Sequence, residues 1–249
     1  MENPLFSIIT ITFNAAAELQ PTMESVAGQT CRDFEHILVD GASRDNTVAL
    51  ARELGGDNLR IISERDKGLY DAMNKGMRMA RGKYLIFLNA GDSFSVHDTL
   101  EHYACAAREY DADIIYGDTL IVDEHRQVIR RRHLSAPEVL TFESFSEGML
   151  ICHQAFVVKK SIAPEYDLKY RFSADYDWTV RCIGNTTPEK CHNLHEVTIH
   201  YLDAGMTEKN KVASLRERFE VMSNHYGRGK AVARHLSFIP RAIARKIKS

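Results

Sequence analysis

The first third of the chain alternates short apolar runs with stretches of helical spacing. The run at 6–13, FSIITITF, is rich in β-branched residues and too continuously apolar for a half-exposed strand, so we expect a central parallel strand. The stretch at 15–29 repeats apolar residues at helical intervals, with Pro21 in its first turn. The same alternation predicts strands at 36–40, 59–64 and 83–89 and helices at 45–55 and 70–82. This rhythm favours right-handed crossovers and a parallel sheet.

The pattern changes in the second half of the chain, where strands and helices no longer alternate regularly. We expect a helix at 98–110, a strand at 112–118, a hairpin or edge pair within 119–134, an irregular stretch at 135–174, a short helix at 175–184, a strand at 196–202 and a charged amphipathic helix at 209–227. No internal repeat or obvious linker interrupts the sequence, so one large domain with a tail is the simplest interpretation.

Charge and cysteine content narrow the class of protein. The net charge of −2 over 249 residues gives no general attraction to nucleic acid. The five cysteines are odd in number and never spaced C-x-x-C, which indicates reduced thiols in a cytoplasmic protein. Cys182, Cys191, His192 and His195 match no common zinc module, so we interpret them as core thiols and surface histidines. We expect neither a signal peptide nor a membrane span.

The C-terminal stretch carries a local excess of positive charge. Seven Lys or Arg and no acidic residue lie between Arg228 and Ser249, interleaved with apolar residues such as Val232, Leu236 and Ile243. A basic amphipathic helix of this kind suits an anionic membrane surface. A helix packed on the domain with a solvated basic face, or a frayed end, explains the pattern equally well. Peripheral membrane association is therefore a hypothesis.

Polar residues follow each of the four expected parallel strands. The strand ends carry Thr12, Phe13 and Asn14; Asp40; Glu64 and Asp66; and Asn89 and Asp92. Because the carboxyl ends of parallel strands share one crevice, where α/β folds bind ligands, we expect these groups to converge. Each of them alone would be explained as a helix cap or a turn residue. Caps do not account for the stops at Asn14 and Asp92.

Several familiar phosphate-binding and nucleophile motifs are missing. No G-x-G-x-x-G follows the first strand, and the chain has neither a Walker P-loop nor a G-x-S-x-G elbow. Dinucleotide oxidoreductases, P-loop hydrolases and serine hydrolases of these types are therefore disfavoured. Without a glycine-rich cradle, a bound diphosphate would need another source of positive charge, such as a divalent cation on oxygen ligands.

Four ordered motifs together resemble a known enzyme family. SIITITFNAAAEL, HILVDGASRDNT, ERDKGLYDAMNKGMRMARGKYLIFLNAGD and FSADYDW are similar to the family 2 inverting glycosyltransferases, over roughly residues 5–205. The resemblance implies the α/β GT-A fold, which has a Rossmann-like, mostly parallel sheet with helices on both faces and a smaller irregular acceptor region. It divides the chain into a domain at 1–205, with a nucleotide-sugar half at 1–118 and an acceptor half at 119–205, and a basic helical extension at 206–249.

The resemblance also implies roles for the donor-side residues. Phe13 would stack on the base, with Thr12 and Asn14 beside it. Asp40 would accept a hydrogen bond from the base, and Asp66 and Asn74 would line the nucleotide and sugar pocket. An aromatic face with a carboxylate acceptor suits a uracil or guanine ring. A core aromatic is the alternative for Phe13, and the sequence weighs the two equally.

The metal motif of the family departs from its usual form here. Asn89 and Gly91 stand where relatives carry acids, and only Asp92 remains acidic in NAGD. An amide oxygen can still bind Mg²⁺ or Mn²⁺, which needs few carboxylates when phosphates and waters complete the shell. Asp92 is therefore the expected metal ligand. His200 lies where many relatives supply an additional ligand, and an ordinary strand histidine is at least as good an interpretation.

The catalytic carboxylate is expected in FSADYDW. Ala174 replaces the glutamate of the family's Glu-Asp pattern, and Asp175 matches the aspartate. Asp175 would be the general base that takes the proton of an acceptor hydroxyl; alternatively, it is a first-turn acid of the helix. Asp177 would point elsewhere. His153, in CHQAFVVKK, is a weaker candidate to face the acceptor or the diphosphate.

These expectations combine into one main hypothesis and two competitors. The main one is an inverting glycosyltransferase that uses a UDP- or GDP-sugar and a divalent metal, acts on a glycan or lipid-linked acceptor in cell-surface polysaccharide biosynthesis, and is cytoplasmic or peripheral on the inner membrane face. An inactive nucleotide-sugar-binding protein is the alternative, motivated by Asn89, Gly91 and Ala174. A sugar-nucleotide pyrophosphorylase needs a glycine-rich, arginine-containing loop after the first strand, and NAAAEL is not one.

Overall fold

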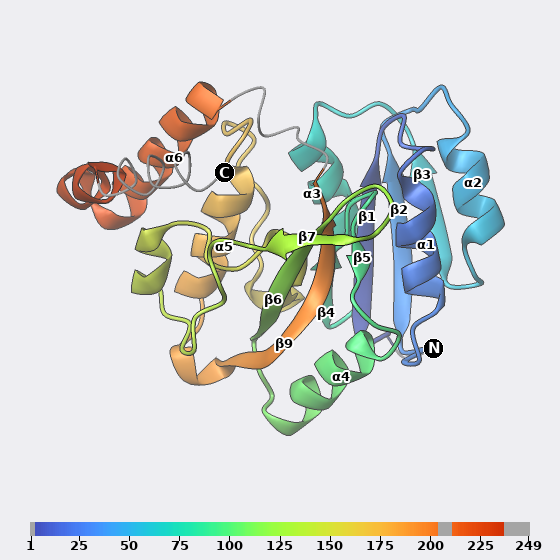
Figure 1. Cartoon of the computed structure of the whole chain (residues 1–249), viewed down its shortest axis with the longest axis horizontal. Helices are drawn as coiled ribbons and strands as arrows, with labels where there is room; N and C mark the ends of the chain where they lie inside the picture. Colours follow the sequence, from blue (N-terminus) through green and yellow to red (C-terminus); the bar gives the residue numbers. More distant parts are fainter. Residues whose placement is uncertain (1–2, 204–210, 237–249) are drawn as a thin grey trace.

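One curled sheet organises the molecule. The computed structural model describes residues 3–203 and 211–236 (Figure 1). The sheet is ordered β3-β2-β1-β4-β8-β6-β9-β5, with β7 paired to β6. Its first four strands run parallel, as predicted: β1 (Phe6–Thr12), β2 (Phe34–Asp40), β3 (Leu59–Ser63) and β4 (Tyr84–Phe87). β1 and β2 are buried throughout because both of their faces are covered.

The helices of the first half cover both faces of these strands. α1 (Leu19–Ala27) and α2 (Thr47–Leu54) pack together, and their buried side chains form a small apolar cluster with Leu38 of β2. α3 (Leu69–Met79) packs on the other face. There, a Cβ on Gly76 would stand 2.5 Å from Ile9 Cγ2, so only glycine allows this close approach of helix to strand.

The second half of the chain completes the sheet with strands of mixed direction. α4 (Thr99–Glu109) precedes β6 (Ile114–Val122), which forms the expected hairpin with β7 (Val128–Arg131). β9 (Cys191–Leu202) runs parallel to β6, and the two-residue β5 (Ser93–Phe94) pairs with its far end. β8 (Phe156–Lys159) lies between β4 and β6, antiparallel to both, within the stretch expected to be irregular. Its three apolar residues and one lysine are too few for periodicity to distinguish a strand.

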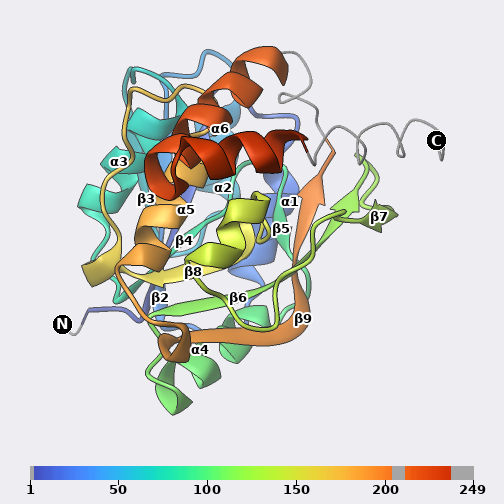
Figure 2. The same ribbon diagram turned by 90° about the vertical axis from the view of Figure 1, so that its left-hand side faces the viewer.

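Two helices close the end of the molecule that carries the irregular segments. α5 (Ala174–Gly184) packs against α6 (Lys211–Tyr226), as Figure 2 shows. Residues 228–236 are also helical; Ala231 is fully buried, and Lys230 and Arg234 pair with Glu143 and Glu147. This part of the basic tail therefore packs on the domain. The apolar tail positions from Phe238 onward lie outside the described residues. No helix in the described ranges has the length and apolar character that a membrane crossing requires.

Candidate active site

The carboxyl ends of β1 and β2 meet in a densely hydrogen-bonded corner. Asp40 is fully buried, and its carboxylate accepts hydrogen bonds from Thr12 Oγ1 (3.1 Å), Ser63 Oγ (2.6 Å), Ser43 N (2.9 Å) and Ser43 Oγ. Burial acts to raise the pKa of Asp40, but these bonds outweigh it and lower the pKa below its usual value. Because four donors fill the acceptor sites of a carboxylate, contact between Asp40 and a base requires one serine to release it.

Next to this corner, an aromatic ring faces solvent beside a carboxylate. Phe13 is 66% exposed, so the core-aromatic interpretation is wrong. A Cβ on Gly41 would stand 3.3 Å from Phe13 Cδ2 and 2.6 Å from Asp66 Oδ2, so the ring and the carboxylate both lie against Gly41. Asp66 Oδ1 accepts the Gly68 N–H at 2.8 Å, and Oδ2 has no hydrogen-bond partner within the described residues. This combination suits a planar base that carries N–H donors.

Asn14 ties the two strand ends together. Its backbone N–H donates to Ser43 Oγ (2.7 Å), and its Oδ1 accepts the Arg44 N–H (2.9 Å). Asn14 and Ala42 both have positive φ, 48° and 62°, and left-handed backbone is uncommon for residues with a side chain. Strained backbone held by several bonds is typical of ligand-binding loops.

After β4, the NAGD segment is a tight turn anchored on α1. The Asp92 N–H donates to the Asn89 carbonyl (3.0 Å), and Gly91 has φ 95°, as the third position of a type II turn requires. Thr22 Oγ1 of α1 accepts the Gly91 N–H (2.9 Å) and donates to the Asp92 carbonyl (2.6 Å). The turn is therefore fixed by its own sequence and by α1.

The Asp92 carboxylate is buried inside this turn. Its Oδ1 accepts the Leu202 N–H at 3.0 Å and its Oδ2 accepts Gln154 Nε2 at 2.8 Å, while its side chain is almost fully enclosed. Burial raises the pKa of Asp92 to about 7, against the lowering effect of these bonds and of the Arg126 charge.

The expected metal centre does not form from the described residues. His200 reaches the same edge, paired with Ser93 across β5 and β9, but no group of three His, Cys, Asp or Glu side chains is gathered there or elsewhere in 3–203 and 211–236. Both Asp92 oxygens already accept hydrogen bonds, and a guanidinium lies beside them. The buried Asn89 Oδ1 has no hydrogen-bond partner among the described residues, but one neutral oxygen is a poor substitute for the acids of the usual motif. The residues present do not fit a divalent cation.

Asp175 lies in the first turn of α5 with one oxygen held and the other unoccupied. Its Oδ1 accepts the Tyr176 N–H (2.9 Å) and the Tyr70 hydroxyl (3.2 Å). Its Oδ2 has no hydrogen-bond partner among the described residues, and the side chain is partly exposed. Burial first, and then the charge of Asp175, raise the pKa of Tyr70, so this hydroxyl stays a donor. Because Tyr70 lies in the first turn of α3, it links the catalytic candidate to the donor half.

Tyr201 of β9 connects the two acidic positions. Burial raises the pKa of Tyr201 first, and the nearby carboxylates of Asp92 and Asp175 raise it further. Asp92 also accepts the N–H of Leu202, the residue after Tyr201, so the NAGD turn lies at this end of β9.

The backbone that leads into α5 is held by a carboxylate from α6. Glu217 accepts the N–H groups of Arg171 (3.0 Å), Phe172 (2.7 Å) and Ser173 (3.0 Å). Anions are favourable at this end of a helix because of its unpaired N–H groups and dipole. Asp177 points away from Asp175, as expected, and pairs with groups of α5 and α6.

Two expected site residues are core residues instead. Asn74 is 1% exposed, and its amide exchanges two hydrogen bonds with the backbone of Tyr166 (2.7 and 3.0 Å), so it does not line an open pocket. His153 is enclosed by the rings of Phe87, Tyr166 and Trp178, with its Nε2 2.6 Å from the Tyr166 hydroxyl. Burial lowers its pKa to about 4, so it is a neutral part of the core and faces neither acceptor nor diphosphate.

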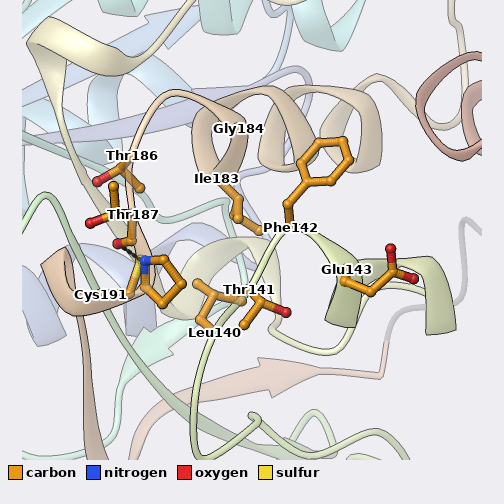
Figure 3. Close-up of a pocket in the computed structure, with 10 residues that line it drawn as sticks. Leu140, Thr141, Phe142, Glu143, Ile183, Gly184, Thr186, Thr187 and Cys191 are labelled. Carbon is orange, nitrogen blue, oxygen red and sulfur yellow. Dashed lines mark hydrogen bonds between the residues drawn. The ribbon is translucent and has the colours of Figure 1, made fainter.

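A separate cavity of about 570 Å³ lies at the opposite end of α5 (Figure 3). Ile183 and Gly184 from the end of α5 line it, together with Leu140, Phe142 and Cys191. Gly184 lies nine helical positions after Asp175, or roughly 14 Å along the helix. The cavity is therefore not part of the site at the sheet edge.

Comparison with protein families and curated sequences gives consistent matches. The model of the family described as Glycosyl transferase family 2 matches residues 7–166. A PGL/p-HBAD biosynthesis glycosyltransferase of Mycobacterium bovis is 38% identical over 213 residues, which cover 82% of this chain and 79% of the relative. An uncharacterized glycosyltransferase of Methanocaldococcus jannaschii is 29% identical over 196 residues, covering 74% and 67%.

Solved structures share the architecture at low sequence identity. S. aureus TarS 1-349 in complex with UDP-GlcNAc superposes with a TM-score of 0.72 at 18% identity, over 96% of this chain and 73% of that one. The mannosyltransferase PcManGT from Pyrobaculum calidifontis, in complex with GDP-Man and Mn²⁺, gives 0.60 at 14% identity, over 95% and 75%. These likenesses confirm the expected GT-A fold.

Proposed function

The chain belongs to glycosyltransferase family 2, and from this premise we propose that it moves a sugar from a nucleoside diphosphate to an acceptor hydroxyl, with inversion at the anomeric carbon. In this proposal residues 1–118 bind the donor and residues 119–205 bind the acceptor. The observation that carries it is the state of Asp175, whose Oδ1 is oriented by two donors while Oδ2 is left for a substrate proton.

The donor site is assigned to the edge where Phe13 and Asp66 both lie against Gly41. Stacking on Phe13 and acceptance of a base N–H by Asp66 or Asp40 would suit uracil or guanine. The bound UDP-GlcNAc of TarS and GDP-Man of PcManGT support a UDP- or GDP-sugar as the donor class.

Asp175 acts as the general base in this proposal. Its free Oδ2 takes the proton of the acceptor hydroxyl, whose oxygen forms a bond to the anomeric carbon as the bond to the diphosphate oxygen breaks. Attack from the face opposite the leaving group inverts the centre, so one base suffices and no sugar–enzyme intermediate forms. The nucleoside diphosphate leaves with the electron pair of the broken bond.

The acceptor and the cellular location of the reaction stay predictions, and the prediction of the acceptor rests on a relative. The name of the mycobacterial relative refers to PGL/p-HBAD biosynthesis, which supports a lipid-linked or surface-glycan acceptor for this chain. Cytoplasmic location and association with the inner membrane face are part of the same proposal. Replacing Arg241, Arg245, Lys246 and Lys248 by Gln should then weaken binding to anionic vesicles, and unchanged binding would contradict membrane association.

The decisive experiment combines nucleotide binding with turnover. Calorimetry with UDP, GDP, dTDP and CMP, each with Mn²⁺ and with a chelator, identifies the base. The same measurements test the metal dependence that the family resemblance implies and with which the Mn²⁺ complex of PcManGT is consistent, but which the residues of the NAGD turn do not favour. Release of nucleoside diphosphate from the matching sugar donor then measures turnover. Asp175→Asn should lose turnover by about 10²- to 10⁴-fold and keep binding.

Matched outcomes separate the competing functions. Asp167→Asn removes a carboxylate that is paired with Lys169 at the surface and should leave turnover unchanged. Nucleotide binding without turnover, and without any effect of Asp175→Asn, would identify an inactive binding protein. Absence of nucleotide binding would overturn the assignment of the donor site.

A further inference from the structure

The tip of the β6–β7 hairpin places a guanidinium on the NAGD turn. Arg126 Nη1 donates to the Gly91 carbonyl at 2.6 Å, and Nη2 donates to Ser93 Oγ. Both acceptors flank Asp92, whose charge interacts with Arg126. The hairpin and the NAGD turn are far apart in sequence, and these contacts join them at the edge of the sheet.

The backbone of the hairpin holds Arg126 in an unfavourable conformation. Its φ is +64°, in the left-handed region that turns usually fill with glycine or asparagine. Asp123 fixes this turn: its carbonyl accepts the Arg126 N–H at 3.0 Å, and its Oδ1 accepts the N–H groups of His125 (2.9 Å) and Gln127 (2.8 Å). A purely structural turn would be more stable with glycine at this position. Strain retained at a charged side chain favours a function for that side chain.

The charges around the turn differ from those of a metal site. Asn89 and Gly91 remove two acids from the motif, Asp92 is enclosed, and Arg126 adds a positive charge next to both turn and strand. Arg126 has five N–H donors, and three of them have no hydrogen-bond partner among the described residues.

We infer that Arg126 binds the diphosphate of the donor and supplies there the positive charge that the family resemblance assigns to a divalent metal. Planar guanidinium groups match phosphate oxygens with two parallel hydrogen bonds, and the bond to Gly91 fixes the orientation of this one. The inference rests on the proposed function, because it needs the donor to lie at this sheet edge. It predicts that the chain binds a nucleoside diphosphate in the presence of a chelator.

The test separates contacts with phosphate from contacts with the base. Affinities for UDP, GDP, uridine and guanosine are measured by calorimetry in EDTA and again with Mn²⁺, for the wild-type chain and for Arg126→Gln, Arg126→Lys and Arg130→Gln. Arg126→Gln should weaken the preferred diphosphate by about 10- to 100-fold in EDTA and leave the nucleoside affinity unchanged. Arg126→Lys should recover part of the lost affinity, because lysine keeps the positive charge but lacks the two parallel N–H donors of the guanidinium.

Arg130 is the matched control, since it lies on the same hairpin and pairs with the exposed Asp203. Its variant should bind the diphosphate as the wild type does, and circular dichroism and melting temperatures confirm that all variants fold. Equal diphosphate affinity in Arg126→Gln and wild type would overturn the inference and leave the donor site intact. Wild-type binding that disappears in EDTA and returns with Mn²⁺ would also overturn it. No nucleotide binding under any condition would overturn the proposed function and this inference together.

Discussion

Phe13 exposes two thirds of an aromatic side chain at the end of a buried strand, so the ring is available for stacking on a ligand. Stacking of a base on an aromatic ring contributes about 1–3 kcal/mol by alanine substitution. Phe13→Ala should therefore weaken both the nucleoside and the nucleoside diphosphate by about 10-fold or more in calorimetry, in contrast to Arg126→Gln. Val96→Ala, another half-exposed apolar residue, is the control. Unchanged nucleoside affinity in Phe13→Ala would place the base elsewhere.

Tyr70 is a positioning residue for Asp175. Its hydroxyl donates to Asp175 Oδ1 at 3.2 Å, while its ring stacks on Tyr166 with centroids 5.6 Å apart. Tyr70→Phe keeps the stacking and removes the hydrogen bond, so kcat should fall by about 3- to 10-fold with the donor KM unchanged. Steady-state kinetics give this split, and an equal change in kcat and KM would instead indicate a general disturbance of the site. Tyr84→Phe, which removes a buried hydroxyl bonded to the Ala112 carbonyl, serves as control.

Individual site residues differ in how far the sequence can predict them. Asp40, Asp66 and Asp175 follow strand ends or begin a helix within recognisable motifs, so their placement could be expected. Asn74 and His153 lie within or beside similar motifs, yet burial decides their roles, and burial depends on neighbours distant in sequence. Arg126 belongs to no motif, because only the folded hairpin brings it to the NAGD turn.

At the level of elements, α5 depends on α6 for its N-terminal hydrogen bonds. Glu217 accepts three backbone N–H groups, and charge-assisted bonds of this kind contribute about 1.5–3 kcal/mol in favourable cases. Glu217→Gln should lower the melting temperature by about 3–8 °C and reduce kcat more than donor affinity, because Asp175 loses its fixed backbone. Glu220→Gln, on the exposed face of α6, is the matched control. Equal effects of the two substitutions would show that the hydrogen bonds to Glu217 contribute nothing specific.

The sequence correctly predicts the strands of the first half, where apolar runs are buried. It fails for β8 and for the start of β9, which become strands only through pairing with distant strands. β1 to β4 and their helices follow from long apolar runs and helix caps. β8 was missed because its four residues become a strand only between β4 and β6. β9 begins at Cys191 rather than 196, since a polar start such as Cys-His-Asn becomes a strand only through its parallel pairing with β6. Tertiary context therefore outweighs local pattern in the acceptor half.

At the scale of the whole molecule, one continuous core joins the two halves. Rings from β4, from the segment after β8 and from α5 pack together: Phe87, Tyr166 and Trp178 lie within 5.6 Å of one another by ring centroid. Substitutions in either half should thus affect one cooperative unfolding transition. The free energy of unfolding of the whole chain can then reveal the protonation of a single buried side chain.

His36 is such a group, and it makes stability depend on pH. It lies in the middle of β2, bonded through Nε2 to Thr10 Oγ1 (2.9 Å), and burial lowers its pKa from 6.5 to about 4. Between these values the unfolded chain binds the proton and the native chain does not, so the stability contributed by neutral His36 is complete above pH 6.5. It is lost, by about 1.4 kcal/mol per pH unit, as the pH falls toward 4.

The substitution His36→Gln isolates this effect, because glutamine keeps a neutral hydrogen-bonding group and cannot titrate. Urea unfolding at pH 7, 6 and 5 should show the variant gaining stability relative to wild type, by about 2 kcal/mol at pH 5 compared with pH 7. Asp92, whose raised pKa acts in the opposite direction over the same range, is present in both proteins and cancels in the difference. His125→Gln, at an exposed turn, should show no such trend. A constant difference between His36→Gln and wild type across this range would mean that His36 is protonated within the native sheet.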